Sequence, residues 1–146
     1  PRVCVPVDLA RHGFVVPLTD AGFDVTAPAI IVWEGVSMYL DSPVAEGVVE
    51  QMAELSVSGS QIVADYAEMR WFKGSDFETA TNAIATDLDR GGEPLRAGLS
   101  DVHATLTANG FDVLDDEATE DLRPRYGLPP RPRHYPTRMV LAQRRG

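Results

Sequence analysis

Three carboxylates, Asp8, Glu34 and Asp65, each follow an apolar run that predicts a β-strand. In an open α/β sheet the carboxyl ends of the parallel strands meet at one edge, where ligands bind. Carboxylates accept hydrogen bonds and favour cations. A crevice lined by these acids suits a ligand rich in donors: ribose hydroxyls, an adenine amino group, an ammonium or a sulfonium. The alternative is structural, since turns after strands are often acidic.

Other chemistries find less support in the sequence. It contains no G-x-G-x-x-G and no G-x-x-x-x-G-K-[ST] motif, which argues against nicotinamide dinucleotides and nucleoside triphosphates. It contains no G-x-S-x-G motif. Cys4 lies within an apolar segment and is expected to be a buried small hydrophobe rather than a nucleophile. Glu34 and Asp65 could act as a glycosidase pair, but the expected open sheet and the few aromatic residues disfavour that reading.

The run over residues 29–33 is central to the predicted fold. It contains five consecutive apolar residues, which is typical of a strand buried on both faces of a parallel sheet. Gly35, directly after Glu34, would let a ligand or backbone approach closely. A helix begins at Asp41 or Ser42, and its apolar residues recur at helical spacing as far as residue 55.

The remaining segments complete an α/β pattern. Residues 2–7 are expected to form an edge strand, because Pro6 cannot donate to a ladder. The other expected strands cover residues 61–64, 111–114 and 137–143, and the expected helices cover 17–21, 76–90, 100–109 and 117–126. This order predicts a parallel sheet with helices on both faces and a C-terminal antiparallel hairpin of the last two strands.

Length and charge limit the classes of function. With 146 residues, one domain is expected. All 22 acidic residues lie at or before Asp121, whereas residues 122–146 contain seven arginines and no acid. We expect this end to fold back onto the acidic body rather than to bind RNA, and we expect no nucleic-acid partner.

The sequence also bears on location and extent. It has no run of 18 apolar residues, so no membrane span is expected. A single cysteine fits a reducing, cytoplasmic location. The chain begins at Pro1, inside an expected strand and without an initiating methionine, which suggests part of a longer protein.

Several segments resemble the leucine carboxyl methyltransferase family, and more closely its bacterial, actinobacterial branch of S-adenosylmethionine-dependent methyltransferases. The segment W-E-G-V-S-M-Y-L at residues 33–40 is the most specific, and weaker similarity is found over residues 5–9, 22–24, 92–99 and 110–113. The resemblance implies a Rossmann-like methyltransferase sheet, S-adenosyl-L-methionine as cofactor and a small-molecule methyl acceptor. It also implies cofactor-binding roles for Asp8, Leu9, Glu34, Gly35, Met38 and Tyr39. No catalytic base can be assigned from the matched motifs.

One departure from the family is large. Its first two strands, with the glycine-rich cofactor loop and the ribose-binding acid, are not found in this sequence, so the chain would supply the third strand and strands four to seven. We therefore expect an isolated chain with an incomplete cofactor site. The alternative function is a non-catalytic binding module that forms a homodimer through exposed sheet edges. Trp71 and Phe72 could cover a pocket or belong to the core.

Overall fold

The structure, a computed structural model, describes residues 2–67, 86–96, 98–129 and 137–146. Trp71, Phe72 and most of the expected helix 76–90 lie outside the described residues, although residues 86–90 are helical. Among the described residues no helix has the length and apolar character that a membrane crossing requires. The described elements, in chain order, are α1 Val15–Asp20, β1 Ile30–Trp33, the 3₁₀-helix η1 Ser37–Tyr39, α2 Ser42–Glu54, β2 Gln61–Ala67, α4 Val102–Ala108, β3 Phe111–Ala118, α5 Thr119–Arg125 and β4 Thr137–Arg144.

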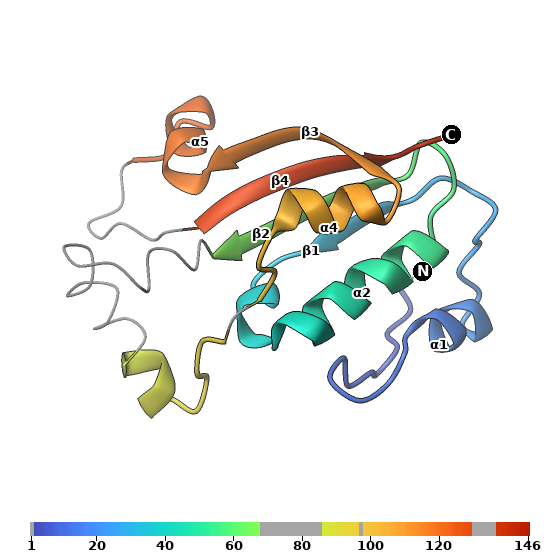
Figure 1. The fold of residues 1–146 in the computed structure, drawn as a ribbon, viewed down its shortest axis with the longest axis horizontal. Coiled ribbons are helices and arrows are strands. Elements are labelled where there is room, and N and C mark those ends of the chain that lie inside the picture. Colours follow the sequence, from blue (N-terminus) through green and yellow to red (C-terminus); the bar gives the residue numbers. More distant parts are fainter. Residues whose placement is uncertain (1, 68–85, 97, 130–136) are drawn as a thin grey trace.

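The four strands form one mixed sheet in the order β1-β2-β4-β3. β1 and β2 are parallel, and β4 runs antiparallel to both β2 and β3. The parallel crossover through α2 and the C-terminal antiparallel hairpin are as predicted from the sequence. Figure 1 shows α2 and α4 on one side of the strands and α5 on the other, so helices contact both faces.

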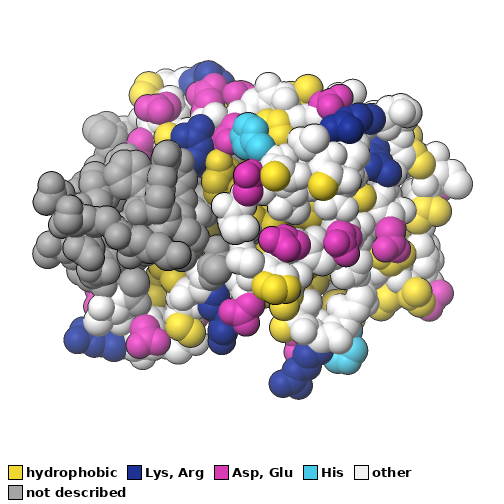
Figure 2. Space-filling view, viewed as in Figure 1, with side chains coloured by type: hydrophobic (Ala, Val, Ile, Leu, Met, Phe, Trp, Pro, Cys, Tyr) yellow, Lys and Arg dark blue, Asp and Glu magenta, His cyan; other side chains and the backbone are white. Residues whose placement is uncertain are grey.

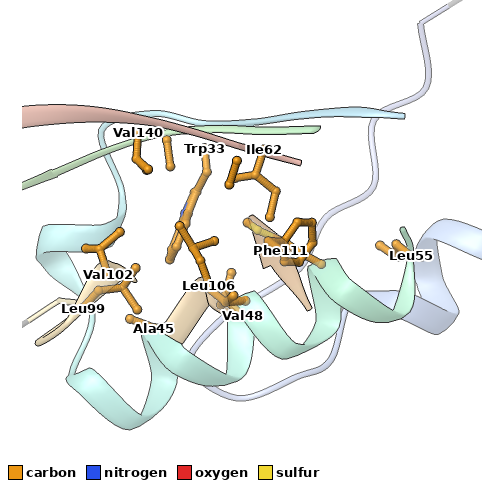
Figure 3. Packing of buried hydrophobic residues seen from close by; sticks show 14 of the residues in the cluster. Trp33, Ala45, Val48, Leu55, Ile62, Leu99, Val102, Leu106, Phe111 and Val140 are labelled. Atoms are coloured by element: carbon orange, nitrogen blue, oxygen red, sulfur yellow. The ribbon is translucent and has the colours of Figure 1, made fainter. Parts of the chain in front are cut away.

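The core lies between the sheet and the pair α2 and α4. Figure 3 shows Trp33 pointing from the sheet toward α2, between side chains of α4 and Phe111. Phe111 is fully buried, and the Arg144 guanidinium lies 5.4 Å from the centre of its ring. The helical periodicity of α2 places Ala45, Val48, Val49 and Met52 on the buried side.

Three predictions about β1 and the N-terminal segment are wrong. β1 is not buried on both faces: Trp33 and Ile31 face the core, whereas Ile30 and Val32, on the opposite face of the strand, are 72% and 66% exposed. Residues 2–7 form no strand: Pro6 lacks an N–H, and the described sheet has no strand paired to this segment. Cys4 is therefore exposed rather than a buried hydrophobe.

Two element boundaries also differ from the prediction. β2 continues to Ala67, so Asp65 lies inside the strand instead of after it. β3 continues to Ala118. Its register against β4 shifts between Val113 and Asp115, which makes Leu114 an extra residue in a β-bulge. The residues after the bulge keep pairing with β4, so the helix α5 begins only at Thr119.

The expectation that the arginine-rich end folds onto the acidic body is confirmed for the described residues. Figure 2 shows basic and acidic side chains side by side along the edge of the molecule formed by α5, β3 and β4. The nitrogen–oxygen distances of these pairs range from 2.6 to 3.7 Å, and the pairs are Arg123–Glu120, Arg125–Glu117, Arg138–Asp116 and Arg145–Asp112. All four acids belong to the stretch that immediately precedes the arginines.

Phe111→Ala is expected to lower the free energy of unfolding by about 3–5 kcal/mol, because it empties the centre of the core and removes the surface that Arg144 covers. Leu114→Ala, on the same strand at a side chain that is 54% exposed, should stay within about 0.5 kcal/mol of the wild type. Urea unfolding followed by circular dichroism measures both. Equal losses in the two variants would contradict this description of the core.

Candidate functional site

The turn after β1 is tied to the end of β2. β1 ends at Trp33, Glu34 is exposed, and Gly35 takes a positive φ of 70°, which a glycine adopts without strain. The Gly35 N–H donates to Oδ1 of Asp65 at 2.8 Å, and the Ser37 hydroxyl donates to the backbone oxygen of Asp65 at 2.9 Å. The structure therefore brings together two of the three predicted carboxylates at the carboxyl end of the parallel strands.

Asp65 is in an unusual electrostatic position. Burial raises its pKa above the usual value, the Gly35 N–H partly offsets this, and the negative charge of Glu34 raises it further. A half-buried carboxylate next to a second, exposed carboxylate gives this edge of the sheet negative potential. Such an edge favours hydrogen-bond donors and cations, as the sequence predicts.

The segment that follows Gly35 is held by a second segment from far along the chain. Met38 is buried and Tyr39 is half-buried in η1. The backbone N–H of Arg96 donates to the Met38 oxygen at 2.8 Å, and that of Gly98 donates to the Leu40 oxygen at 2.9 Å. These two hydrogen bonds hold Arg96 and Gly98 beside η1 and the residue that follows it.

Two further contacts fix that arrangement. Nη1 of Arg96 lies 3.1 Å from Oδ1 of Asp41, at the start of α2. Gly98 has a φ of 56°, and a Cβ at this position would lie 3.0 Å from the backbone oxygen of Ser37. Only glycine combines this backbone conformation with so close an approach.

These segments line an open hollow of about 460 Å³ beside the turn after β1. Its walls come from the two segments that the backbone bonds bring together, with Gly35 and Tyr39 on one side. The lining residues are Gly35, Tyr39, Gly92, Glu93, Pro94 and Arg96. No sequence pattern assigns Glu93, Arg96 or Gly98 to a site, although residues 92–99 resemble a segment of a known family.

Asp8 and Leu9 do not line this hollow. The Asp8 carboxylate accepts from the Ala10 N–H at 3.0 Å and lies 3.6 Å from Nε of Arg11, so it stabilises its own turn. Leu9 packs against the hydrophobic core. Among the predicted site residues, the structure thus groups Glu34, Gly35, Met38 and Tyr39, and it places Asp8 and Leu9 in the N-terminal segment.

Comparison with known proteins identifies relatives in sequence. Residues 1–53 match the model of the leucine carboxyl methyltransferase family. A protein of Mycolicibacterium gilvum named "putative S-adenosyl-L-methionine-dependent methyltransferase" is 32% identical over 135 residues, which cover 86% of this chain and 43% of that protein. A protein of the same name from Mycobacterium avium is 38% identical over 64 residues, or 44% of this chain and 20% of the relative. The chain spans less than half the length of these curated relatives.

Solved structures show the same fold. A DUF574-family protein from Streptomyces avermitilis superposes with a TM-score of 0.63 at 14% identity, over 94% of this chain and 53% of that one. Magnesium protoporphyrin IX methyltransferase from Synechocystis, solved with bound S-adenosylhomocysteine, gives a TM-score of 0.50 at 15% identity, over 94% and 48% of the two chains. The predicted resemblance to actinobacterial leucine carboxyl methyltransferase-like proteins is confirmed, and so is the predicted Rossmann-like fold.

Asp65→Asn is expected to raise the free energy of unfolding at pH 7 by about 1 kcal/mol or less, since the half-buried side chain is partly screened by solvent. Because the folded pKa of Asp65 is raised, its ionised form costs stability above that pKa, and the cost disappears as the pH falls through it. The amide oxygen of the substituted side chain can still accept from Gly35. Urea unfolding from pH 7 to pH 3 should show the two proteins converging.

Asp24→Asn tests a carboxylate whose pKa is shifted in the opposite direction from that of Asp65. Hydrogen bonds from the hydroxyl and the N–H of Thr26 lower the pKa of the exposed Asp24. This variant should therefore be less stable than the wild type at pH 7, with the deficit vanishing as the pH falls through the lowered pKa. The same direction of pH dependence at both positions would contradict the electrostatic description of Asp65.

Proposed function

We propose that this chain is the C-terminal part of a single S-adenosyl-L-methionine-dependent methyltransferase domain that methylates an oxygen atom, carboxylate or hydroxyl, of a small molecule. The observation that carries the proposal is the hollow at the carboxyl end of β1. It is formed by two segments that are far apart in the sequence, and both resemble the same methyltransferase family.

The chemistry of the side chains fits the proposed cofactor. When bound, S-adenosyl-L-methionine supplies a methyl group on a positively charged sulfonium. The acidic edge made by Glu34 and Asp65 favours a cation and accepts hydrogen bonds from its donors. We propose that Glu34, Gly35, Met38 and Tyr39 hold the cofactor at the hollow, where Gly35 and Tyr39 form part of the wall and the buried Met38 lies behind it. We propose that Asp8 and Leu9, which do not line the hollow, contact the cofactor from the N-terminal segment. Positioning then contributes most of the catalysis, because the transfer is an in-line displacement.

The domain assignment rests on two findings. The chain spans less than half of its curated relatives, and β1 presents a free edge with two large apolar side chains, Ile30 and Val32, largely exposed. An added strand beside β1 would satisfy that edge and help to cover these side chains. On this proposal the 146 residues alone hold an incomplete cofactor site.

We propose a cytoplasmic location because the one cysteine, Cys4, is a free thiol.

Calorimetric titration with S-adenosylhomocysteine tests the proposal on the complete gene product that contains this chain. Binding is expected there, and Glu34→Ala should weaken it roughly tenfold or more, as loss of a hydrogen bond to a charged group does. The matched Glu50→Ala, on an exposed position of α2, should leave the affinity unchanged. Tight binding by the isolated 146 residues would contradict the incomplete site, and no binding by the complete protein would contradict the function.

A second candidate function is a non-catalytic module that forms a homodimer. The exposed edge of β1 and the exposed Val32 side chain favour it, because such edges pair with other strands.

Sedimentation velocity separates the two candidates. If the module is a dimer through β1, Val32→Lys should convert it to a monomer by placing a charge in the interface. Val16→Lys, at a similarly exposed valine of α1, should leave the dimer intact. A wild-type protein that sediments as a monomer at all concentrations would exclude this candidate.

A further inference from the structure

Side chains from three other elements meet at one carboxylate, that of Asp116 in β3. Its Oδ2 lies 2.8 Å from the Tyr66 hydroxyl of β2 and 2.6 Å from Nε2 of His103 on α4. Its Oδ1 accepts from Nε of Arg138, on β4, at 2.8 Å. The side chain of Asp116 is only 12% exposed, whereas that of His103 is 57% exposed.

This cluster lies at the same edge of the sheet as the hollow. Tyr66 directly follows Asp65, whose carboxylate binds the turn after β1, and Tyr66 pairs with Arg138 across the β2–β4 ladder. Figure 1 shows that α4 begins, β3 ends and β4 begins at the end of the molecule where β1 leads into η1. In sheets of this kind that edge is where ligands bind.

The partners of Asp116 determine how His103 presents its ring. Hydrogen bonds from His103, Tyr66 and Arg138 outweigh burial and lower the pKa of Asp116, so it is ionised at neutral pH and acts only as an acceptor. The imidazole must then donate through its Nε2–H. In the neutral imidazole Nδ1 then carries the lone pair, and Nδ1 has no partner among the residues that the structure describes. A carboxylate that orients a neutral histidine in this way is the arrangement that prepares a general base.

We propose that His103, oriented by Asp116, is the general base of the methyl transfer and that the acceptor is therefore a hydroxyl compound, a phenol or an alcohol, rather than a carboxylate. The proposal rests on the proposed methyltransferase function. It selects between the two acceptor classes that the proposed function leaves open.

The selection follows from the acidity of the two classes. A carboxylic acid, with a pKa of about 4, is already ionised at neutral pH and needs no base, whereas a phenol, with a pKa of about 10, keeps its proton. In the proposed step Nδ1 of His103 takes the hydroxyl proton while the acceptor oxygen bonds to the methyl carbon. The carbon–sulfur bond breaks, its electron pair stays on sulfur, and the products are a methyl ether, S-adenosylhomocysteine and a protonated histidine.

The test is methyl transfer from labelled S-adenosyl-L-methionine by the complete gene product to a panel of simple phenols and alcohols and of matched carboxylic acids. Mass spectrometry distinguishes ether from ester products. We expect ethers, and we expect His103→Gln to slow their formation roughly 100-fold or more without changing the affinity for S-adenosylhomocysteine. Because His103 is largely exposed, this variant should fold normally.

The pH profile separates a base from a structural residue. Ether formation by the wild type should rise with pH, because only a neutral imidazole can accept the hydroxyl proton, and this rise should be absent in His103→Gln. Four charged or titratable groups surround the histidine: Asp116 of β3, Tyr66 of β2, Arg138 of β4 and Asp101, which caps α4. The neighbouring helix α2 contributes apolar side chains to the shared core.

Matched controls make the outcomes decisive. Asp116→Asn should slow ether formation, whereas Asp112→Asn, on the same strand and also paired with an arginine, should not. Ester products only, unchanged rates in His103→Gln, or no transfer to any hydroxyl compound while S-adenosylhomocysteine binds would each overturn the proposal. A complete protein that binds no S-adenosylhomocysteine would instead refute the underlying function.

Discussion

The central constraint on this structure is that β2 carries two hydrogen-bond ladders of opposite direction. On one side it pairs in parallel with β1, and on the other it pairs antiparallel with β4 over seven residues. The parallel pair requires a helical crossover, which α2 provides, and the antiparallel pair brings the C-terminal strand into the middle of the sheet. The described residues that we assign to function lie at or near the carboxyl end of this strand, apart from Asp8 and Leu9.

The elements with strong local signals were predictable from the sequence. The apolar run before Glu34, the periodic helix α2 and the paired C-terminal strands have clear patterns, and the structure confirms them. Residues 2–7 carry a strand-like pattern too, but a strand needs a partner, and none of the described strands pairs with them. The prediction that Ile30 and Val32 are buried is wrong because the residues of a strand do not record which of its faces other elements will cover.

The candidate site was predictable in part. Glu34, Gly35 and Tyr39 lie in one specific motif, and the structure places Gly35 and Tyr39 in the wall of the hollow. Glu93 and Arg96 were not predicted as site residues. Their segment is placed at the hollow by backbone hydrogen bonds to the η1 segment, and local sequence patterns do not predict such long-range hydrogen bonds. His103 and Asp116 were not predicted for a similar reason: they are 13 positions apart in the sequence, and the turn between α4 and β3 brings them together.

The β-bulge at Leu114 has a consequence for alignments of this chain with its relatives. Side chains alternate between the faces of a strand, so the extra residue reverses the alternation and puts Val113 and Asp116 on the same face. A relative without the extra residue would need its carboxylate one position earlier to reach a histidine on the preceding helix. Equivalence in β3 should therefore be assigned by strand face, with a one-residue gap where required, rather than by counting from the preceding glycine.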